Sequence, residues 1–134
     1  MSDEKVQHNS TAEVVELSAE ELKLTIKNFE TPDERGEVPK AYMKFIDIGG
    51  HRITKYEFEP GFRWTEHASP VMGTELCEQL HLIYQLSGRT GVKMKDGTEL
   101  EYGPGSLALI PPGHDGWAVG DESAVFLDFG KLLT

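Results

Sequence analysis

The stretch from Leu80 to His114, LHLIYQLSGRTGVKMKDGTELEYGPGSLALIPPGH, decides the fold of this chain. It consists of short apolar or alternating runs separated by glycine and proline. Asp96-Gly97 lies between two such runs, and this dipeptide is typical of a two-residue hairpin turn because both positions tolerate positive φ angles. The stretch predicts four successive short strands, at about Leu80–Leu86, Thr90–Lys95, Thr98–Tyr102 and Ser106–Ile110.

The same punctuation continues on both sides of this stretch. Upstream, Gly49-Gly50 predicts a tight hairpin turn between strands at 40–48 and 52–58, and 62–66 has the pattern of a further strand. Downstream, 117–119 and 123–129 complete the set. About nine short strands with almost no helix predict an all-β sandwich or barrel.

The N-terminal part of the chain has a different pattern. Met1 to about Thr11 is polar and is expected to be disordered. Ser18-Ala19-Glu20-Glu21 has the form of a capping box and predicts a short helix from Ser18 to Lys23. Residues 30–40 contain Pro32, Gly36 and Pro39 and are expected to form a loop. We therefore divide the chain into an N-terminal extension, 1–39, and a β-barrel domain, 40–134.

Length, charge and cysteine content restrict the class of protein. A chain of 134 residues has the size of one domain. Its formal net charge of −10 argues against binding to nucleic acids or to anionic membrane surfaces, which both require basic patches. No apolar run approaches the roughly 18 residues of a membrane span, and the first residues do not resemble a secretory signal. With one cysteine and no intramolecular disulfide, the chain is expected to be cytoplasmic.

From Gly61 to Asp128 the sequence resembles the cupin family. The first cupin motif reads G-x5-H-x-H-x3,4-E-x6-G. Five residues separate Gly61 from His67, and six residues separate His81 from Gly88, which puts His81 at the position of the family's glutamate. Cys77 has the place of the second histidine. In the second motif, G-x5-P-x-G-x2-H, the matches are Gly105, Pro111 and Gly113, and the nearest histidine is His114.

The resemblance implies a cupin-type double-stranded β-helix, or jelly-roll barrel, and a homodimer. It also implies a metal centre at the barrel mouth, with His67, Cys77, His81 and His114 as candidate ligands. Imidazole and thiolate favour zinc, iron or copper over magnesium or calcium, so we expect one divalent transition metal per chain. On a straight strand Cys77 and His81 would lie roughly 13 Å apart, so the chain must turn between them.

Each candidate ligand also has an ordinary structural interpretation. His67 could be a hydrogen-bonded wall residue, His81 a core histidine, Cys77 a small buried apolar residue and His114 a loop residue. His8 and His51 are expected at the surface. Glu66, Glu75 and Glu78 lie near the candidate ligands and are either a general base or oxygen ligand or ordinary exposed carboxylates. Asp115 either orients His114 or stabilises a turn.

Two functions follow from these observations. The first is a metal-dependent enzyme of the oxygenase, isomerase or lyase type that acts on a small organic molecule. The second is a non-catalytic cupin that binds a small ligand or acts as a sensor, for example through the thiol of Cys77. The chain has no phosphate-binding loop ahead of a helix and no G-x-S-x-G elbow, so neither a nucleotide site nor a serine hydrolase is indicated.

Overall fold

The computed structural model describes residues 17–130, which form two antiparallel sheets. The nine strands are β1 (Glu34–Val38), β2 (Ala41–Ile48), β3 (His51–Phe58), β4 (His81–Ser87), β5 (Arg89–Met94), β6 (Glu99–Tyr102), β7 (Leu107–Ile110), β8 (His114–Val119) and β9 (Ala124–Asp128). Two four-residue helices, α2 (Trp64–His67) and α3 (Ser69–Met72), lie between β3 and β4. The predicted all-β jelly-roll of the cupin type is confirmed.

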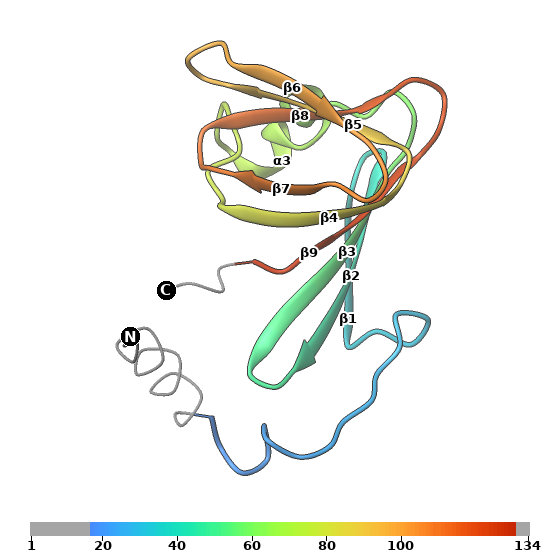
Figure 1. Ribbon diagram of the computed structural model, residues 1–134. Coiled ribbons are helices and arrows are strands. Elements are labelled where there is room, and N and C mark those ends of the chain that lie inside the picture. Colours follow the sequence, from blue (N-terminus) through green and yellow to red (C-terminus); the bar gives the residue numbers. More distant parts are fainter. Residues whose placement is uncertain (1–16, 131–134) are drawn as a thin grey trace, which may run out of the picture.

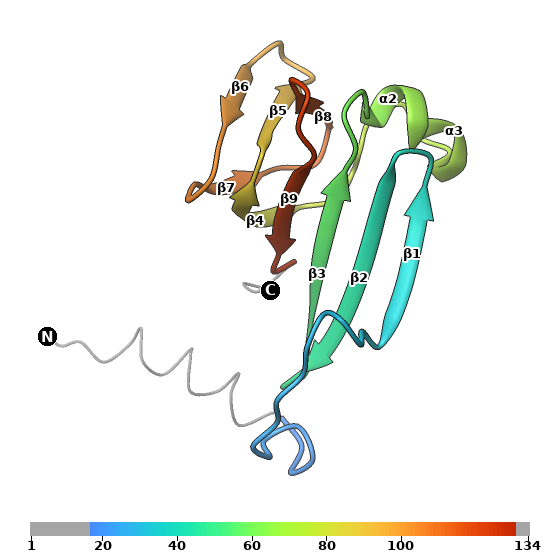
Figure 2. The same ribbon diagram turned by 90° about the vertical axis from the view of Figure 1, so that its right-hand side faces the viewer.

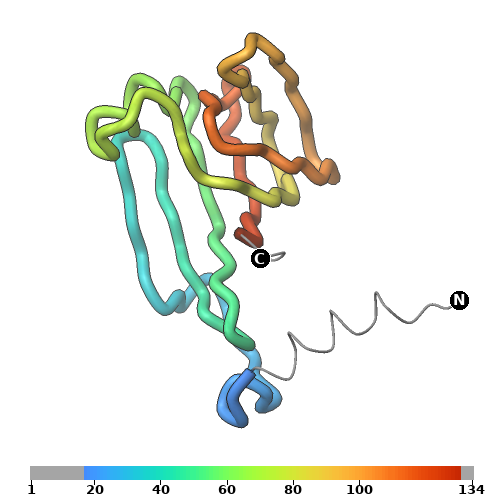
Figure 3. Tube along the Cα trace, turned by 90° about the vertical axis from the view of Figure 1, so that its left-hand side faces the viewer, coloured from blue at the N-terminus to red at the C-terminus, as the bar shows by residue number. Residues whose placement is uncertain are grey.

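One sheet has the strand order β1-β2-β3-β9-β4-β7, and the other has the order β6-β5-β8. In Figure 1 the smaller sheet lies across β4 and β7, and the ends of β2 and β3 extend beyond the other strands. Figure 2 shows β1, β2 and β3 side by side, with α2 and α3 at one end of them. Residues 17–30 lie beyond the opposite end, as the blue part of the tube in Figure 3 shows.

The predicted hairpin turns are present. Gly49 and Gly50 both have positive φ angles and join β2 to β3, with Ile48 paired to His51. Gly97, with a φ angle of 95°, turns the chain between β5 and β6. Glycine has no Cβ and adopts these angles without strain, so the position of each turn fixes the register of the strands that it joins.

Strand alternation decides which side chains enter the barrel. The cross-strand pairs Tyr56–Phe126 and Ile83–Asp128 place these four side chains on the inner face of the larger sheet. The main core cluster consists of Ile83, Val92, Ile110 and Phe126, which come from both sheets. The inner face of this sheet therefore carries both the apolar core and the polar groups described below.

Three local predictions were wrong. Residues 30–40 contain strand β1, which pairs with β2 at the edge of the sheet. This strand reads as a loop because an edge strand has few buried side chains. The segment predicted as a strand at 62–66 keeps only an isolated bridge between Arg63 and Trp117 and then enters α2, where the amide of His67 donates to the Arg63 carbonyl at 2.9 Å. The chain can therefore turn at this point towards α3.

The third wrong prediction is the helix from Ser18 to Lys23. The capping box itself forms: the Ser18 amide donates to Glu21, and the Glu21 amide donates to the Ser18 hydroxyl. Only a turn follows, because the few backbone bonds here do not offset the cost of nucleating a helix. The predicted disorder at Met1–Thr11 lies outside the described residues.

The helices among residues 17–130 are only a single turn long, and none of them is suited to crossing a bilayer.

Candidate metal centre

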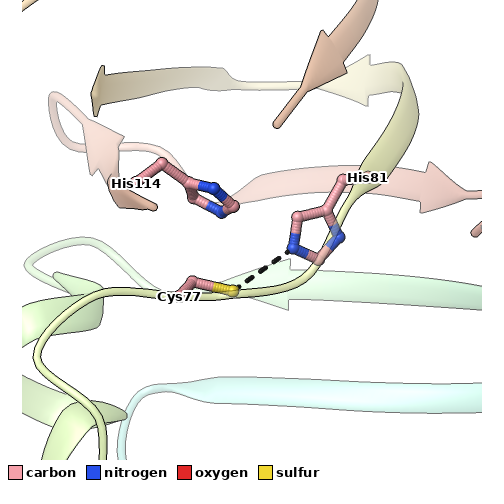
Figure 4. Close-up of side chains that lie close together, drawn as sticks. All are labelled: Cys77, His81 and His114. Carbon is pink, nitrogen blue, oxygen red and sulfur yellow. Dashed lines mark hydrogen bonds between the residues drawn. The ribbon is translucent and has the colours of Figure 1, made fainter. Parts of the chain in front are cut away.

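Three of the four candidate ligands meet at one point. Donor atoms of Cys77, His81 and His114 all lie within 4.8 Å of one another. Figure 4 shows the three side chains pointing towards each other from the segment before β4, the start of β4 and the start of β8. The Cys77 sulfur lies 3.5 Å from Nε2 of His81. Donors around a tetrahedral zinc ion are about 3.3–3.8 Å apart, so the Cys77–His81 pair already has the separation of two ligands of one ion.

The backbone holds Cys77 against the first residue of β8. The Cys77 amide donates to the His114 carbonyl at 2.8 Å, and the Gly113 amide donates to the Cys77 carbonyl at 2.7 Å. Residues 78–80 then run without regular structure into β4, so the chain turns between Cys77 and His81 as the sequence required. This turn removes the roughly 13 Å separation of a straight strand.

Asp128 fixes the orientation of His81. Its Oδ2 lies 2.6 Å from Nδ1 of His81, and both side chains are nearly buried. The other carboxylate oxygen accepts from the amides of Leu82 and Gly130. A carboxylate accepts the Nδ1 hydrogen, so Nε2 is the ring nitrogen that faces Cys77. Histidines that bind metals usually have such a partner on the other nitrogen.

A backbone carbonyl plays the same part for His114. Its Nδ1 lies 2.7 Å from the carbonyl oxygen of Pro111. Since a carbonyl oxygen only accepts, Nδ1 carries the hydrogen and Nε2 keeps its lone pair. Pro111 and Gly113, which match the second cupin motif, thus shape the bend that sets the tautomer of this ring.

The two titrating partners shift each other's pKa. Burial opposes ionisation of Cys77, but the neighbouring imidazoles of His114 and His81 and the Gln79 backbone lower the thiol pKa to about 6. Burial disfavours the charged ring of His81, yet Asp128 and Cys77 raise its pKa to about 9. In the absence of metal, the pair is therefore a thiolate beside an imidazolium near neutral pH.

His67 does not join this cluster, which corrects the expectation that four ligands converge. Its Nδ1 lies 3.0 Å from the Arg63 amide within the helical turn of α2, and its ring stacks on Phe62. The motif placed His67 on a strand leading into the barrel, but α2 carries it to the outside of the cluster. The structure thus brings together three donors and not four.

Asp115 does not orient His114, which was one of the two roles that the sequence left open for it. Its carboxylate accepts from Nε of Arg63 at 2.8 Å and from the amide and hydroxyl of Thr65. These contacts fasten the segment that contains α2 to β8. The buried aspartate therefore secures the wall of the barrel near the cluster, without contact to the three donors.

Asp128 is the residue that sequence reasoning missed. The signal for it was present: Asp128 follows Phe126 by two residues in an apolar strand, so it points to the same face as that core residue. A carboxylate on the inner face of a strand is costly unless it has a partner. That cost marks Asp128 as a polar group with a role in the barrel.

A cavity of about 960 Å³ adjoins the cluster and includes Cys77, His81 and His114 in its lining. Of the carboxylates considered near the ligands, Glu78 lines it, while Glu66 and Glu75 are exposed and do not. Tyr56 also lines it, and burial together with the charges of Asp128 and Cys77 raises the pKa of its hydroxyl. Three protein donors beside a cavity leave coordination positions for a ligand.

No protein-family model matches the sequence, and no curated protein matches it at a significant level. Solved structures do match the fold. A cupin-like protein from Thermotoga maritima has a TM-score of 0.55 and 16% identity, covering 80% of this chain and 83% of that one. An ectoine synthase from P. lautus has a TM-score of 0.59 and 10% identity, covering 80% of this chain and 78% of that one.

The polyketide cyclase RemF from Streptomyces resistomycificus is similar to a comparable degree. Its TM-score is 0.55 with 18% identity, and the match covers 84% of this chain and 88% of that chain. At such identities the likeness establishes the fold. The two antiparallel sheets, the glycine and proline turns and these structural matches agree, and the chain has the fold of the cupin superfamily.

Proposed function

We propose that this protein binds one divalent transition metal ion through Cys77, His81 and His114. The observation that carries the proposal is the arrangement of the two imidazoles. Each has its Nδ1 engaged, by Asp128 or by the Pro111 carbonyl, so that each offers Nε2. A histidine whose only task is to fill the core does not need both the outer partner and a thiol in front of it.

The donor set favours a borderline or soft metal. Two imidazoles and a thiolate suit zinc, iron or copper, whereas magnesium and calcium prefer oxygen ligands. Three protein donors would leave at least one coordination position of the ion unfilled, and all three donors line the cavity. We therefore propose that a small organic molecule enters the cavity and reaches this open position.

Catalysis at this centre is the first of the two functions. A bound metal would polarise an oxygen atom of the ligand, and the barrel wall would exclude water from it. Two proteins with this fold, ectoine synthase and a polyketide cyclase, are named for chemistry on small organic molecules, which supports this choice.

The metal content of the purified protein tests the proposal. We expect about one transition metal ion per chain by elemental analysis after loading and desalting, and loss of the ion in His81→Ala and His114→Ala. His51→Ala is the matched control, because His51 is an exposed histidine outside the cluster. Circular dichroism checks that each variant folds. A wild-type protein that retains no metal would disprove the proposal.

The alternative is a thiol sensor without a metal, and one observation favours it. Cys77, His81 and Asp128 form a chain of contacts of 3.5 Å and 2.6 Å, the order of nucleophile, base and orienting acid. Alkylation by iodoacetamide separates the two functions. A sensor thiol is alkylated equally fast with and without added metal, whereas a metal ligand is protected by stoichiometric zinc.

We also propose that two copies of the chain form a homodimer in the cytoplasm. Leu22, Leu24 and Ile26 alternate with polar residues, and Leu24 and Ile26 are 96% and 87% exposed. A row of exposed apolar side chains in an extended segment is suited to contact with a second copy. Light scattering of the wild type and of Leu24→Asp tests this: we expect a dimer that the substitution dissociates, and a monomeric wild type would contradict it.

A further inference from the structure

The cavity beside the cluster has an apolar wall that continues up to the metal donors. Side chains from both sheets form it, among them Tyr56, Phe58, Val92, Ile110 and Phe126. The rings of Tyr56 and Phe126 stack with their centroids 5.1 Å apart, and the Tyr56 ring lies 6.4 Å from the His81 ring. A molecule bound at the open coordination position would therefore lie directly against aromatic surface.

The same cavity offers almost no positive charge. Among the described residues that line it, Arg52 is the one arginine or lysine. Its guanidinium contacts Asp47 at 2.7 Å and Glu34 at 3.0 Å, so its charge is already balanced. The charges of His81 and Asp128 likewise balance each other, because Nδ1 of His81 lies 2.6 Å from Oδ2 of Asp128. A phosphate or a polycarboxylate would find no free arginine or lysine side chain here, so the metal ion alone would have to balance its several charges.

The volume of the cavity exceeds what a metal ion and its waters need. At about 960 Å³ it lies in the upper part of the range for small-molecule sites, which is about 300 to 1,000 Å³. Aromatic and aliphatic walls with a few polar groups at one end are the usual composition of such sites. The polar end in this protein is the cluster of Cys77, His81 and His114.

We propose that the ligand of this protein is an aromatic or similarly apolar organic molecule with a single oxygen-donor group, neutral or singly charged. The donor group binds the metal, and the apolar part lies against the wall that contains Tyr56 and Phe126. This inference rests on the proposed metal centre. Beyond the metal centre, it excludes phosphorylated and highly anionic molecules as ligands and assigns most of the binding energy to contacts with the barrel wall.

A pair of probes with the same metal-binding group tests the inference on the full chain. The protein is loaded with Co²⁺, whose absorption spectrum reports the ligands of the ion, and is titrated with benzohydroxamate and with acetohydroxamate. The two probes differ only in a phenyl ring against a methyl group. Burial of the additional apolar area predicts that benzohydroxamate binds about 30-fold more tightly or better. Inorganic phosphate is expected to cause no spectral change at millimolar concentration.

The possible outcomes separate the inference from the proposed function. If no Co²⁺ binds, the metal centre is wrong and the inference falls with it. If Co²⁺ binds but the two hydroxamates have equal affinity, the metal centre stands and the apolar site is overturned. Binding of phosphate in place of the hydroxamates would overturn it as well.

A cavity-filling variant locates the effect on the wall. Thr54 is buried on the inner face of β3 and lines the cavity, so Thr54→Phe reduces the space next to the metal without removing a donor. We expect at least a tenfold loss of benzohydroxamate affinity and about a twofold loss at most for acetohydroxamate. Lys55→Phe is the matched control, because the next residue of the strand points outwards. Equal losses of affinity for both probes would contradict the wall as the binding surface. If Thr54→Phe does not fold, the ratio of the two hydroxamate affinities in the wild type tests the inference alone.

Discussion

Replacing Asp128 by asparagine separates the charge of this residue from its shape. Asp128 Oδ2 lies 2.6 Å from Nδ1 of His81, in a site where both side chains are nearly buried. Asparagine can still accept this hydrogen through its amide oxygen, but the bond is no longer charge-assisted. Its NH2 group then faces the amides of Leu82 and Gly130, which lose their acceptor, so circular dichroism and urea unfolding must show that the variant folds. Charge-assisted bonds contribute about 1.5–3 kcal/mol and neutral ones about 0.5–1.5 kcal/mol, so the loss is about 1–2 kcal/mol. We expect metal affinity to fall about 5- to 30-fold.

The pH of the measurement decides whether this loss is seen. The carboxylate of Asp128 also helps to raise the pKa of His81 to about 9, so at neutral pH a proton competes with the metal for Nε2. Asp128→Asn weakens that competition and thus masks part of the loss. At about pH 9.5 the competition is small, because this lies above the pKa of His81. The full effect should therefore appear there, in a titration against a chromophoric chelator.

The matched control is Asp115→Asn. Asp115 and Asp128 are equally buried, each 6% exposed, but Asp115 bonds Arg63 and Thr65 and does not contact the three donors. We expect its metal affinity to stay within about threefold of the wild type, since no donor loses a partner. Equal losses in the two variants, or an unchanged affinity in Asp128→Asn at high pH, would refute the role assigned to Asp128.

Three further predictions concern protons, His67 and the turns. Metal affinity should rise about tenfold per pH unit between about pH 6 and 9, because one proton leaves His81, and chelator competition across this range checks the slope. In the metal-free protein, the lowered pKa of Cys77 increases the unfolding free energy as the pH rises from about 6 to 9, and the raised pKa of His81 decreases it over about the same range. The two effects should cancel. A strong pH dependence of the unfolding free energy in urea would therefore contradict the thiolate–imidazolium pair. His67→Ala should retain its metal by elemental analysis, and loss of the ion would return His67 to the site. Gly88→Ala should lower the unfolding free energy by about 2–4 kcal/mol, since its Cβ would lie 2.0 Å from the Ser123 carbonyl, whereas Gly97→Ala, with open space around it, should lose only about 1 kcal/mol.

The turns carried most of the prediction of the fold. Gly49-Gly50 and Asp96-Gly97 allow few conformations, and each connects two strands whose direction and register it sets. The edge strand β1 escaped prediction because its residues have little burial and hence no apolar alternation. Helix α2 escaped it for another reason: a single helical turn has no period long enough to be recognised.

The candidate site could be predicted only in part. Cys77, His81 and His114 have side chains that bind metals and stand at or next to motif positions, so residue type and spacing were sufficient to select them. His67 has the same two properties, yet α2 directs it elsewhere. The spacing of two residues along the chain limits the distance between them but does not fix where their side chains point. A local change from strand to helix, as at His67, turns the side chain in another direction.

The register between β9 and β4 explains why Asp128 and His81 meet, and why neither residue predicts this contact from the sequence alone. Asp128 pairs with Ile83, and His81 is two residues before Ile83 on the same face of β4. A slip of β9 by one residue would turn Asp128 to the outside and place Leu127 in the barrel, leaving His81 without its carboxylate. The core forbids this slip, because Phe126 would leave the apolar cluster in the same step. The packing of Phe126 therefore fixes the tautomer of His81, so that core stability and the chemistry of the candidate metal centre depend on the same register.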